Sequence, residues 1–166
     1  MSVQVRDAVV EDMRGCRLCL DAVAREGRWL SRLHAGSVEL YVAFWMGMRE
    51  ANAPQTVAVQ QEVVVGWCDI IPDRSPVRAH VGSLGMGLLV SHRGQGIGQR
   101  LLERTLTQAR ARGLERIELS VRQDNIAARA LYERLGFAVE GVRIRDWKHE
   151  GVYRDSVLMA LDIAPA

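Results

Sequence analysis

Hydrophobic positions repeat along the chain with two different periods, and these periods alternate from segment to segment. Four segments carry an apolar residue every three or four positions, which is typical of a helix with one buried face. They are residues 11–26, 38–50, 96–112 and 126–135. Seven shorter segments are rich in β-branched residues or alternate apolar and polar positions, as strands do. They are residues 3–6, 56–59, 63–71, 79–90, 116–121, 137–147 and 152–161.

The order of these segments predicts a mixed α/β fold. A helix separates the fourth and fifth strands, so we expect one right-handed parallel crossover there. Short turns separate the second strand from the third and the sixth from the seventh, which indicates hairpins on both sides of the crossover. Gly82, Gly85 and Gly87 interrupt the fourth strand and predict a bulge or a close approach of the backbone.

Composition narrows the class of protein. The chain has 166 residues, 48% of them hydrophobic, and no repeat or linker divides it, so we expect residues 1–166 to form one domain. A net charge of +2 is too small to indicate a nucleic-acid or membrane partner. The first ten residues include Arg6 and Asp7 and no apolar run, and no long uncharged apolar window follows. We therefore expect a cytoplasmic protein.

The residues that commonly bind metals lack the necessary spacing. Cys16 and Cys19 form a single pair, and Cys68 stands alone, so a structural zinc site lacks its second ligand pair. His34, His92 and His149 show no ligand spacing either. We expect no metal.

The clearest candidate for chemistry is the run Arg93-Gly94-Gln95-Gly96-Ile97-Gly98, between a predicted strand and a predicted helix. Bare amides at a helix N-terminus make a cradle for phosphates. The spacing does not fit a P-loop, because Gln99 and Arg100 follow the last glycine instead of Lys and Ser or Thr. It does not fit the dinucleotide fingerprint either, although Glu118 lies about 20 residues further on, as in that motif.

A second motif lies downstream: Asn125-x-x-Ala128-x-x-x-Tyr132, followed by Gly136-Phe137. Asn125 and Tyr132 are seven residues apart, so they share one helix face about 10 Å apart. Together with Arg-x-x-Gly-x-Gly, this motif resembles the GNAT acyltransferases, which bind acetyl-CoA, over roughly residues 84–137. The resemblance implies a twisted, mixed, mostly antiparallel sheet of about seven strands flanked by about four helices.

The resemblance also implies which residues hold acetyl-CoA. The fourth strand, splayed by a bulge, would offer main-chain groups to the pantetheine arm, and the glycine run would hold the diphosphate. The implied set is Met86, Gly87, Leu88, Arg93, Gly94, Gln95, Gly96, Gly98, Gln99 and Asn125.

Acetyl transfer to an amine needs a base for the amine and a proton donor for the leaving thiolate. Tyr132 is our candidate donor, since a Tyr hydroxyl stays neutral at pH 7; the alternative is a Tyr that only packs on the sheet. Relatives that acetylate protein N-termini have a Glu where this chain has Ser120. The candidate bases are therefore Asp69 and Glu118, and Asp69 could instead pair with an Arg across the sheet.

The acceptor is predicted to be the primary amine of a small, amino-acid-like molecule, attacking directly in a ternary complex. The acceptor is expected to enter between the first two predicted helices and the last hairpin. This part of the chain is rich in Arg, and Arg28, Arg32 or Arg145 could bind a carboxylate. One or two aromatic residues are expected near the acceptor and the rest in the core, among Trp29, Tyr41, Trp45, Trp67 and Trp147. The alternatives are a protein N-terminal or lysine acetyltransferase and a CoA-binding sensor without catalysis. The last hairpin makes a homodimer plausible.

Overall fold

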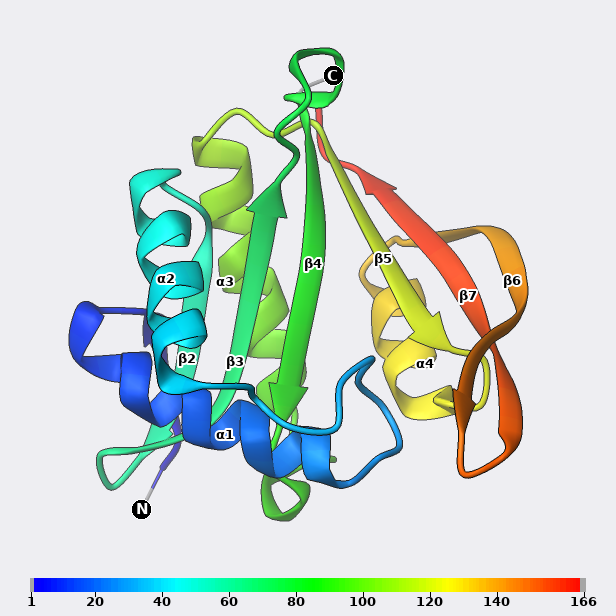
Figure 1. Ribbon diagram of the computed structural model, residues 1–166. Helices are drawn as coiled ribbons and strands as arrows, with labels where there is room; N and C mark the ends of the chain where they lie inside the picture. The colour runs from blue at the N-terminus through cyan, green and yellow to red at the C-terminus, as the bar shows by residue number, and fades with distance from the viewer. Residues whose placement is uncertain (1, 165–166) are drawn as a thin grey trace.

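The computed structural model describes residues 2–164 and contains one seven-stranded sheet with helices on both faces (Figure 1). The strands are β1 (Gln4–Asp7), β2 (Gln55–Gln60), β3 (Val63–Pro72), β4 (Val81–Leu88), β5 (Arg116–Arg122), β6 (Ala138–His149) and β7 (Val152–Asp162). The helices are α1 (Met13–Arg25), α2 (Val38–Glu50), α3 (Ile97–Ala111) and α4 (Ile126–Arg134). The predicted fold class and its numbers of strands and helices are confirmed, and three short 3-10 turns are additional.

The sheet has the order β1-β2-β3-β4-β5-β7-β6, and every neighbouring pair is antiparallel except β4 and β5. The predicted parallel crossover therefore runs from β4 through α3 to β5. These two strands pair at only three positions, the last being Ser83 with Glu118. Beyond this point they separate, as Figure 1 shows. We call this unpaired region the β4–β5 opening.

The bulge predicted in the fourth strand is wrong. The register between β3 and β4 runs without a shift from Gly66–Leu88 to Pro72–Gly82. The glycines instead allow a close approach of side chains from β3. A Cβ at Gly87 would lie 2.3 Å from Cη2 of Trp67, and one at Gly85 would lie 3.0 Å from Oδ1 of Asp69. A larger residue at either position would displace its neighbour.

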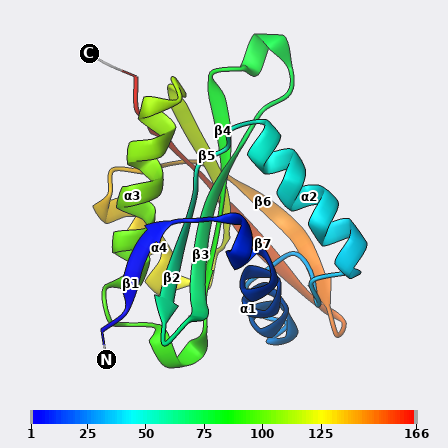
Figure 2. The same cartoon turned by 90° about the vertical axis from the view of Figure 1, so that its left-hand side faces the viewer.

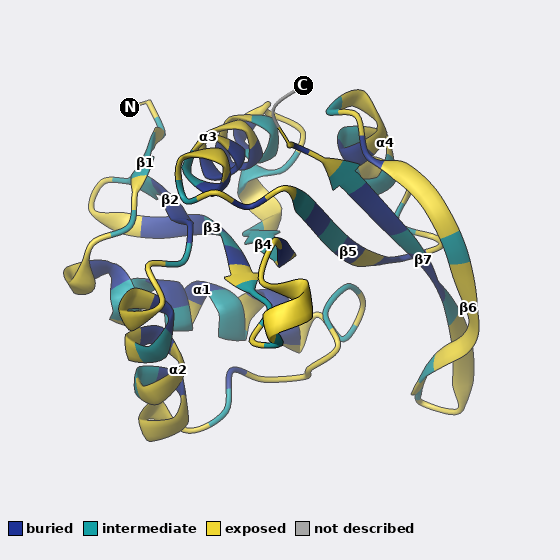
Figure 3. Ribbon diagram, turned by 90° about the horizontal axis from the view of Figure 1, so that it is seen from above, coloured by how far each residue is buried: buried dark blue, intermediate teal, exposed yellow. Residues whose placement is uncertain are grey.

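The helices divide into two layers (Figure 2). Helices α1 and α2 cover one face, where Cys16, Tyr41 and Trp45 form a small core with strand residues. Helices α3 and α4 cover the other face and enclose the larger core. Figure 3 shows that buried residues follow the strands between the layers, whereas β6 is exposed along most of its length. We call the two sides of the sheet the α1/α2 face and the α3/α4 face.

Side chains on β3 alternate between these faces. Cys68 and Ile70 belong to the core beneath α3, and Trp67 packs with the core beneath α1 and α2. Asp69 therefore points toward the α1/α2 face. Val65 would share the face of Trp67 and Asp69 by simple alternation, but it lies in the α3/α4 core, because a bulge at Ala58/Val59 shifts the register of this hairpin.

The helix ends follow local chemistry. Asn125 caps α4, because its Oδ1 accepts the Ala128 N–H at 3.2 Å. Gly113 and Gly136 follow the ends of α3 and α4 with φ of +87° and +94°, which only glycine adopts without strain. Helix α3 begins at Gly96 without any side-chain cap. None of the helices within residues 2–164 has the length and apolar character needed to traverse a bilayer.

Candidate active site

The glycine run forms a loop of free amides at the start of α3. Gly94 and Gly96 have φ of +72° and +75°, and no heavy atom lies within 4 Å of a Cβ built on either. Among residues 2–164, no acceptor takes the amide hydrogens of residues 94–99. These donors stand at the positive end of a 15-residue helix, so the loop fits a diphosphate.

Arg93 holds this loop to two neighbouring elements. Its Nε and Nη2 donate to the carbonyl of Leu88 at 3.0 and 2.8 Å, and its guanidinium pairs with both oxygens of Glu26. The guanidinium thus ties the end of β4 to the end of α1. Direct contact of Arg93 with a phosphate stays a prediction, and the structure adds a positioning role.

The other predicted cofactor residues meet around Gly98. A Cβ at Gly98 would lie 3.4 Å from Leu131 on α4, 3.4 Å from Leu88 and 3.6 Å from Met86. Two β4 side chains therefore reach the start of α3, while Gly87 stays bare on the opposite face. The main-chain edge of β4 facing β5 is unpaired beyond Ser83. An extended, amide-containing arm could add to this edge as a strand does.

Gln95 and Asn125 each have one side-chain group already engaged, and Gln99 has both, since its Oε1 also accepts from Arg134 at 3.4 Å. The Gln95 amide donates to the Ser91 carbonyl at 2.9 Å, and the Gln99 amide donates to Glu103 at 2.8 Å. Asn125 uses its oxygen as the α4 cap, which leaves its Nδ2 as a donor. Their roles toward a cofactor stay predictions.

Tyr132 lies buried on the α3/α4 face, where its ring packs 5.7 Å from that of Phe137. Its hydroxyl has no hydrogen bond to any of residues 2–164. Burial raises the pKa of this phenol, and the neighbouring Cys68 raises it further. The hydroxyl therefore stays protonated at neutral pH, which is the state a proton donor needs.

Asp69 is a half-buried carboxylate on the α1/α2 face. Its side chain makes no hydrogen bond or ion pair with residues 2–164, so the predicted alternative, pairing with an Arg across the sheet, is not what the structure shows. Burial raises the pKa of Asp69 to about 7, and the charge of Arg32 opposes this increase. A carboxyl with such a pKa can accept a proton near neutral pH.

Glu118 is in a different state. Its carboxylate accepts bonds from Arg116 at 2.9 Å and from Arg78 at 2.8 Å. The hydrogen bond from Arg116 is the main reason that its pKa is lowered, and Arg78 adds to it. Both candidate bases face the α1/α2 side, but Glu118 is an ion-paired anion and Asp69 is free. The geometry favours Asp69.

The aromatic and arginine residues predicted around the acceptor differ in their surroundings. Tyr41 and Trp45 are buried residues of α2, and Tyr41 lies near Asp69: burial raises the pKa of its phenol, and the charges of Cys16 and Asp69 raise it further. Arg28 stacks on Trp29 at 4.3 Å, and Arg145 stacks on Tyr153 at 3.9 Å; both distances are from guanidinium Cζ to ring centroid.

Sequence analysis missed Arg122, which stacks on Trp147 and is 2% exposed. The available signal was its alternation with Glu118 and Ser120 along the fifth strand, which places these three side chains on one face.

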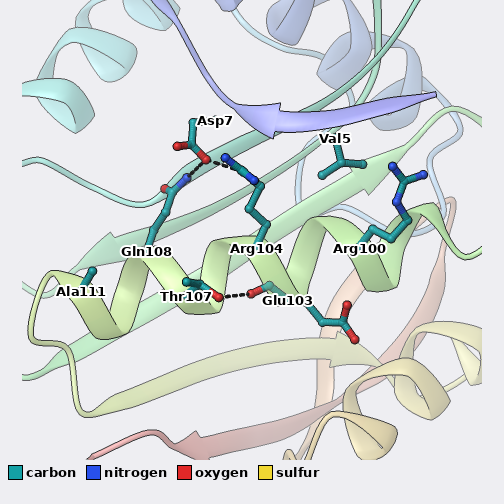
Figure 4. Close-up of a pocket in the computed structure, with 8 residues that line it drawn as sticks. All are labelled: Val5, Asp7, Arg100, Glu103, Arg104, Thr107, Gln108 and Ala111. Atoms are coloured by element: carbon teal, nitrogen blue, oxygen red, sulfur yellow. Dashed lines mark hydrogen bonds and ion pairs between the residues drawn. The ribbon is translucent and has the colours of Figure 1, made fainter. Parts of the chain in front are cut away.

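A surface groove of about 540 Å³ lies elsewhere, between β1 and α3 (Figure 4). Its charged groups already have partners among residues 2–164. Asp7 accepts from both Arg104 and Gln108 at 2.6 Å, Glu103 accepts from Gln99, and Arg100 donates to the Val3 carbonyl. None of the predicted site residues lines this groove. The β4–β5 opening with the glycine loop is therefore our candidate site.

Comparison with known proteins agrees with this arrangement. The model of the Acetyltransferase (GNAT) family matches residues 23–137. The chain belongs to this family. A GNAT-family acetyltransferase from Streptococcus pneumoniae has a similar structure, with a TM-score of 0.88 and 27% identity, covering 98% of this chain and all of that one. The resemblance given by the two motifs is thereby confirmed.

Two curated relatives of this GNAT chain differ in how much they share with it. It is 26% identical over 168 residues to the L-methionine sulfoximine/L-methionine sulfone acetyltransferase of Pseudomonas aeruginosa, covering 99% of this chain and 97% of that one. It is 39% identical over 70 residues to the [Ribosomal protein bS18]-alanine N-acetyltransferase of Escherichia coli, covering 42% of this chain and 47% of that one. The chain spans less than half the length of the relatives with such local matches.

Proposed function

We propose that this GNAT chain transfers the acetyl group of acetyl-CoA to the primary amine of a small, amino-acid-like molecule by direct attack in a ternary complex. The observation that carries the proposal is a pair of groups, one on each face of the sheet. Asp69 lies on the α1/α2 face, and Tyr132 lies on the α3/α4 face beside Cys68, the residue next to Asp69 in β3. A base and a proton donor thus flank one short stretch of the sheet.

The glycine loop fits the diphosphate of acetyl-CoA, since its free amides and the start of α3 supply donors and positive potential without bulky side chains. Residues 94–99 would hold the diphosphate, and the unpaired edge of β4 would hold the pantetheine arm. Acetyl-CoA would supply an activated acetyl group and a thiolate as leaving group.

Asp69 would act on the acceptor. An amine must lose its proton before it can attack, and its ammonium form has a pKa near 10. A carboxylate with a pKa of about 7 is largely ionised at pH 8 and can still accept a proton, directly or through one water. Arg32 lies close enough to influence this charge but forms no ion pair with it.

The Tyr132→Phe variant tests the proton donor. We expect kcat to fall about 10- to 100-fold, because the phenyl ring keeps the packing on Phe137 but has no proton for the thiolate. The Kd for acetyl-CoA, measured by calorimetry, should change less than threefold. Tyr153→Phe is the matched control, since Tyr153 lies exposed on β7, and it should keep the wild-type rate. Equal turnover in the wild type and Tyr132→Phe would remove Tyr132 from this role.

The substrate class is supported by two observations. The relative that matches this chain from end to end is named for acetylation of methionine sulfoximine and methionine sulfone, which are free amino acids. The position where N-terminal acetyltransferases have a Glu is Ser120 here. A protein N-terminus is the second candidate acceptor, because the E. coli relative named for a ribosomal-protein alanine shares 39% identity over the matched 70 residues.

Release of free CoA thiol decides between these acceptors. The purified protein is mixed with acetyl-CoA and, separately, with L-amino acids, amino-acid amides, polyamines and peptides with a free N-terminal alanine. We expect thiol release above background hydrolysis with the amino acids and little with the peptides. Rapid release with peptides alone would favour the second candidate. If none of the amines gives thiol release above hydrolysis while CoA still binds, a CoA sensor is favoured.

A further inference from the structure

Arg122, the last residue of β5, is a buried cation without an acceptor. It is 2% exposed, and its Nε and Nη1 are buried with no hydrogen-bond partner among residues 2–164. Ser156 is its register partner on β7; it is fully buried, and its Oγ also has no partner. Native proteins pair nearly all such groups, and buried unpaired polar atoms concentrate where a ligand supplies the missing bonds.

The carboxylates near Arg122 are already engaged. Asp124 accepts from Arg154 at 2.9 Å, and Asp146 accepts from the Trp147 indole at 3.1 Å. Asp155 accepts the Arg145 N–H at 2.7 Å. None of these carboxylates pairs with Arg122 among residues 2–164, and an acceptor from outside the chain would supply the missing bonds.

Trp147 orients the guanidinium of Arg122. The ring centroid lies 3.3 Å from Cζ, so the indole covers one flat side of the guanidinium and leaves its edge to accept a partner. Each such edge of a guanidinium combines Nη2 with either Nε or Nη1, and its two parallel N–H donors match the two oxygens of a carboxylate. The Ser156 hydroxyl adds a third donor in the neighbouring strand.

Arg122 also lies on the correct face for an acceptor. Ile117, Leu119 and Val121 of β5 belong to the α3/α4 core, so the alternating positions, Arg122 among them, face the α1/α2 side. Asp69 faces the same side from across the β4–β5 opening. The connection after α1 borders this region, because a Cβ at Gly27 would lie 3.0 Å from Nε2 of His149 in the last hairpin.

We propose that Arg122, held by Trp147 and assisted by Ser156, binds a carboxylate of the acceptor molecule. This inference rests on the proposed function and narrows its substrate class to amines that carry a carboxylate. A single free guanidinium fits one carboxylate better than a phosphate, since Arg154 is committed to Asp124. Arg122 is therefore a specificity-determining residue, separate from the groups that move protons.

The test compares an acid with its uncharged counterpart. The probes are L-methionine sulfone and its carboxamide, with thiol release from acetyl-CoA as the readout. For the wild type we expect kcat/KM to be at least about tenfold higher for the acid. In Arg122→Gln it should fall about 100-fold for the acid and less than threefold for the amide, as expected for loss of a buried charged pair. Arg122→Lys should retain part of the preference, and Ser156→Ala should lose a few-fold.

Stability separates a binding role from a structural one. An unpaired buried cation destabilises the free protein, so Arg122→Met, which fills similar volume, should match or exceed the wild-type Tm. Arg110→Gln, an exposed arginine on α3, is the control for the loss of one charge and should preserve the acid preference. A lower Tm for Arg122→Met, or equal losses for acid and amide, would overturn the carboxylate site.

If neither probe is acetylated by the wild type but other amino acids are, the acid and amide comparison is repeated with the best of those. If no amine at all is acetylated, the proposed function fails, and calorimetry with the free acid then tests the subsite alone, where no Arg122-dependent binding would overturn it.

Discussion

Replacing Asp69 with Asn is expected to lower kcat by about 100-fold or more at pH 8, the range that loss of a general base produces. Asn keeps the size and shape of the side chain beside Gly85 but cannot accept the proton of the ammonium. Rates are measured by thiol release at saturating acetyl-CoA. A variant with more than half the wild-type rate would exclude Asp69 as the base.

The pH profile makes this result specific. The base acts when ionised, so wild-type kcat/KM should rise with pH and bend near 7, where the pKa of Asp69 lies. The ionisation of the acceptor amine adds a second limb closer to pH 10. Asp69→Asn should retain only the second limb. Glu118→Gln should keep the bend near 7, because the two arginines lower the pKa of Glu118 and it stays ionised throughout this range.

The same carboxylate affects stability with a predictable sign. A raised pKa in the folded state means that folding favours the protonated form, so stability declines as the pH rises from 3.8 to about 7. Above pH 7, Asp69→Asn removes an unpaired, half-buried charge and should increase Tm by roughly 2 to 8 °C. A variant that loses both activity and Tm would indicate damage to the fold rather than loss of a base.

The sequence predicts the elements of this fold well, because their patterns are local. Helix and strand periods depend on neighbours a few residues away. The predicted bulge in the fourth strand failed for the opposite reason. Glycine allows either a bulge or a close side chain, and only the partner strand, with Trp67 and Asp69, decides between them.

The site was predictable to the extent that it depends on the main chain. The glycine loop binds through amides that any sequence of that spacing exposes, so the motif alone located it. Side-chain states depend on partners distant in sequence. Glu118 and Asp69 are the same chemical group on the same face, yet Arg78 and Arg116 separate their pKa values. Arg122 was missed because its most informative property is the absence of a partner.

Replacing Gly96 with Asp should weaken CoA binding by at least about 100-fold in calorimetry. Gly96 has φ of +75° at the start of α3, and its amide belongs to the free set of residues 94–99. An Asp there strains the backbone and places a negative charge beside the proposed diphosphate site, where like charges cost several kcal/mol. Pantetheine, which lacks the diphosphate, should bind the variant and the wild type alike.

Gly113→Asp provides a closely matched control. Gly113 has φ of +87° and open space around its Cβ position, as Gly96 does, but it follows the opposite end of α3. Both variants add one negative charge and force an Asp into the left-handed backbone conformation, so both should lose similar stability. Only Gly96→Asp should lose CoA affinity, since only that end of the helix offers free amides. Equal affinities in the two variants would mean that the diphosphate binds elsewhere, and the assignment of the loop as a phosphate cradle would then be wrong.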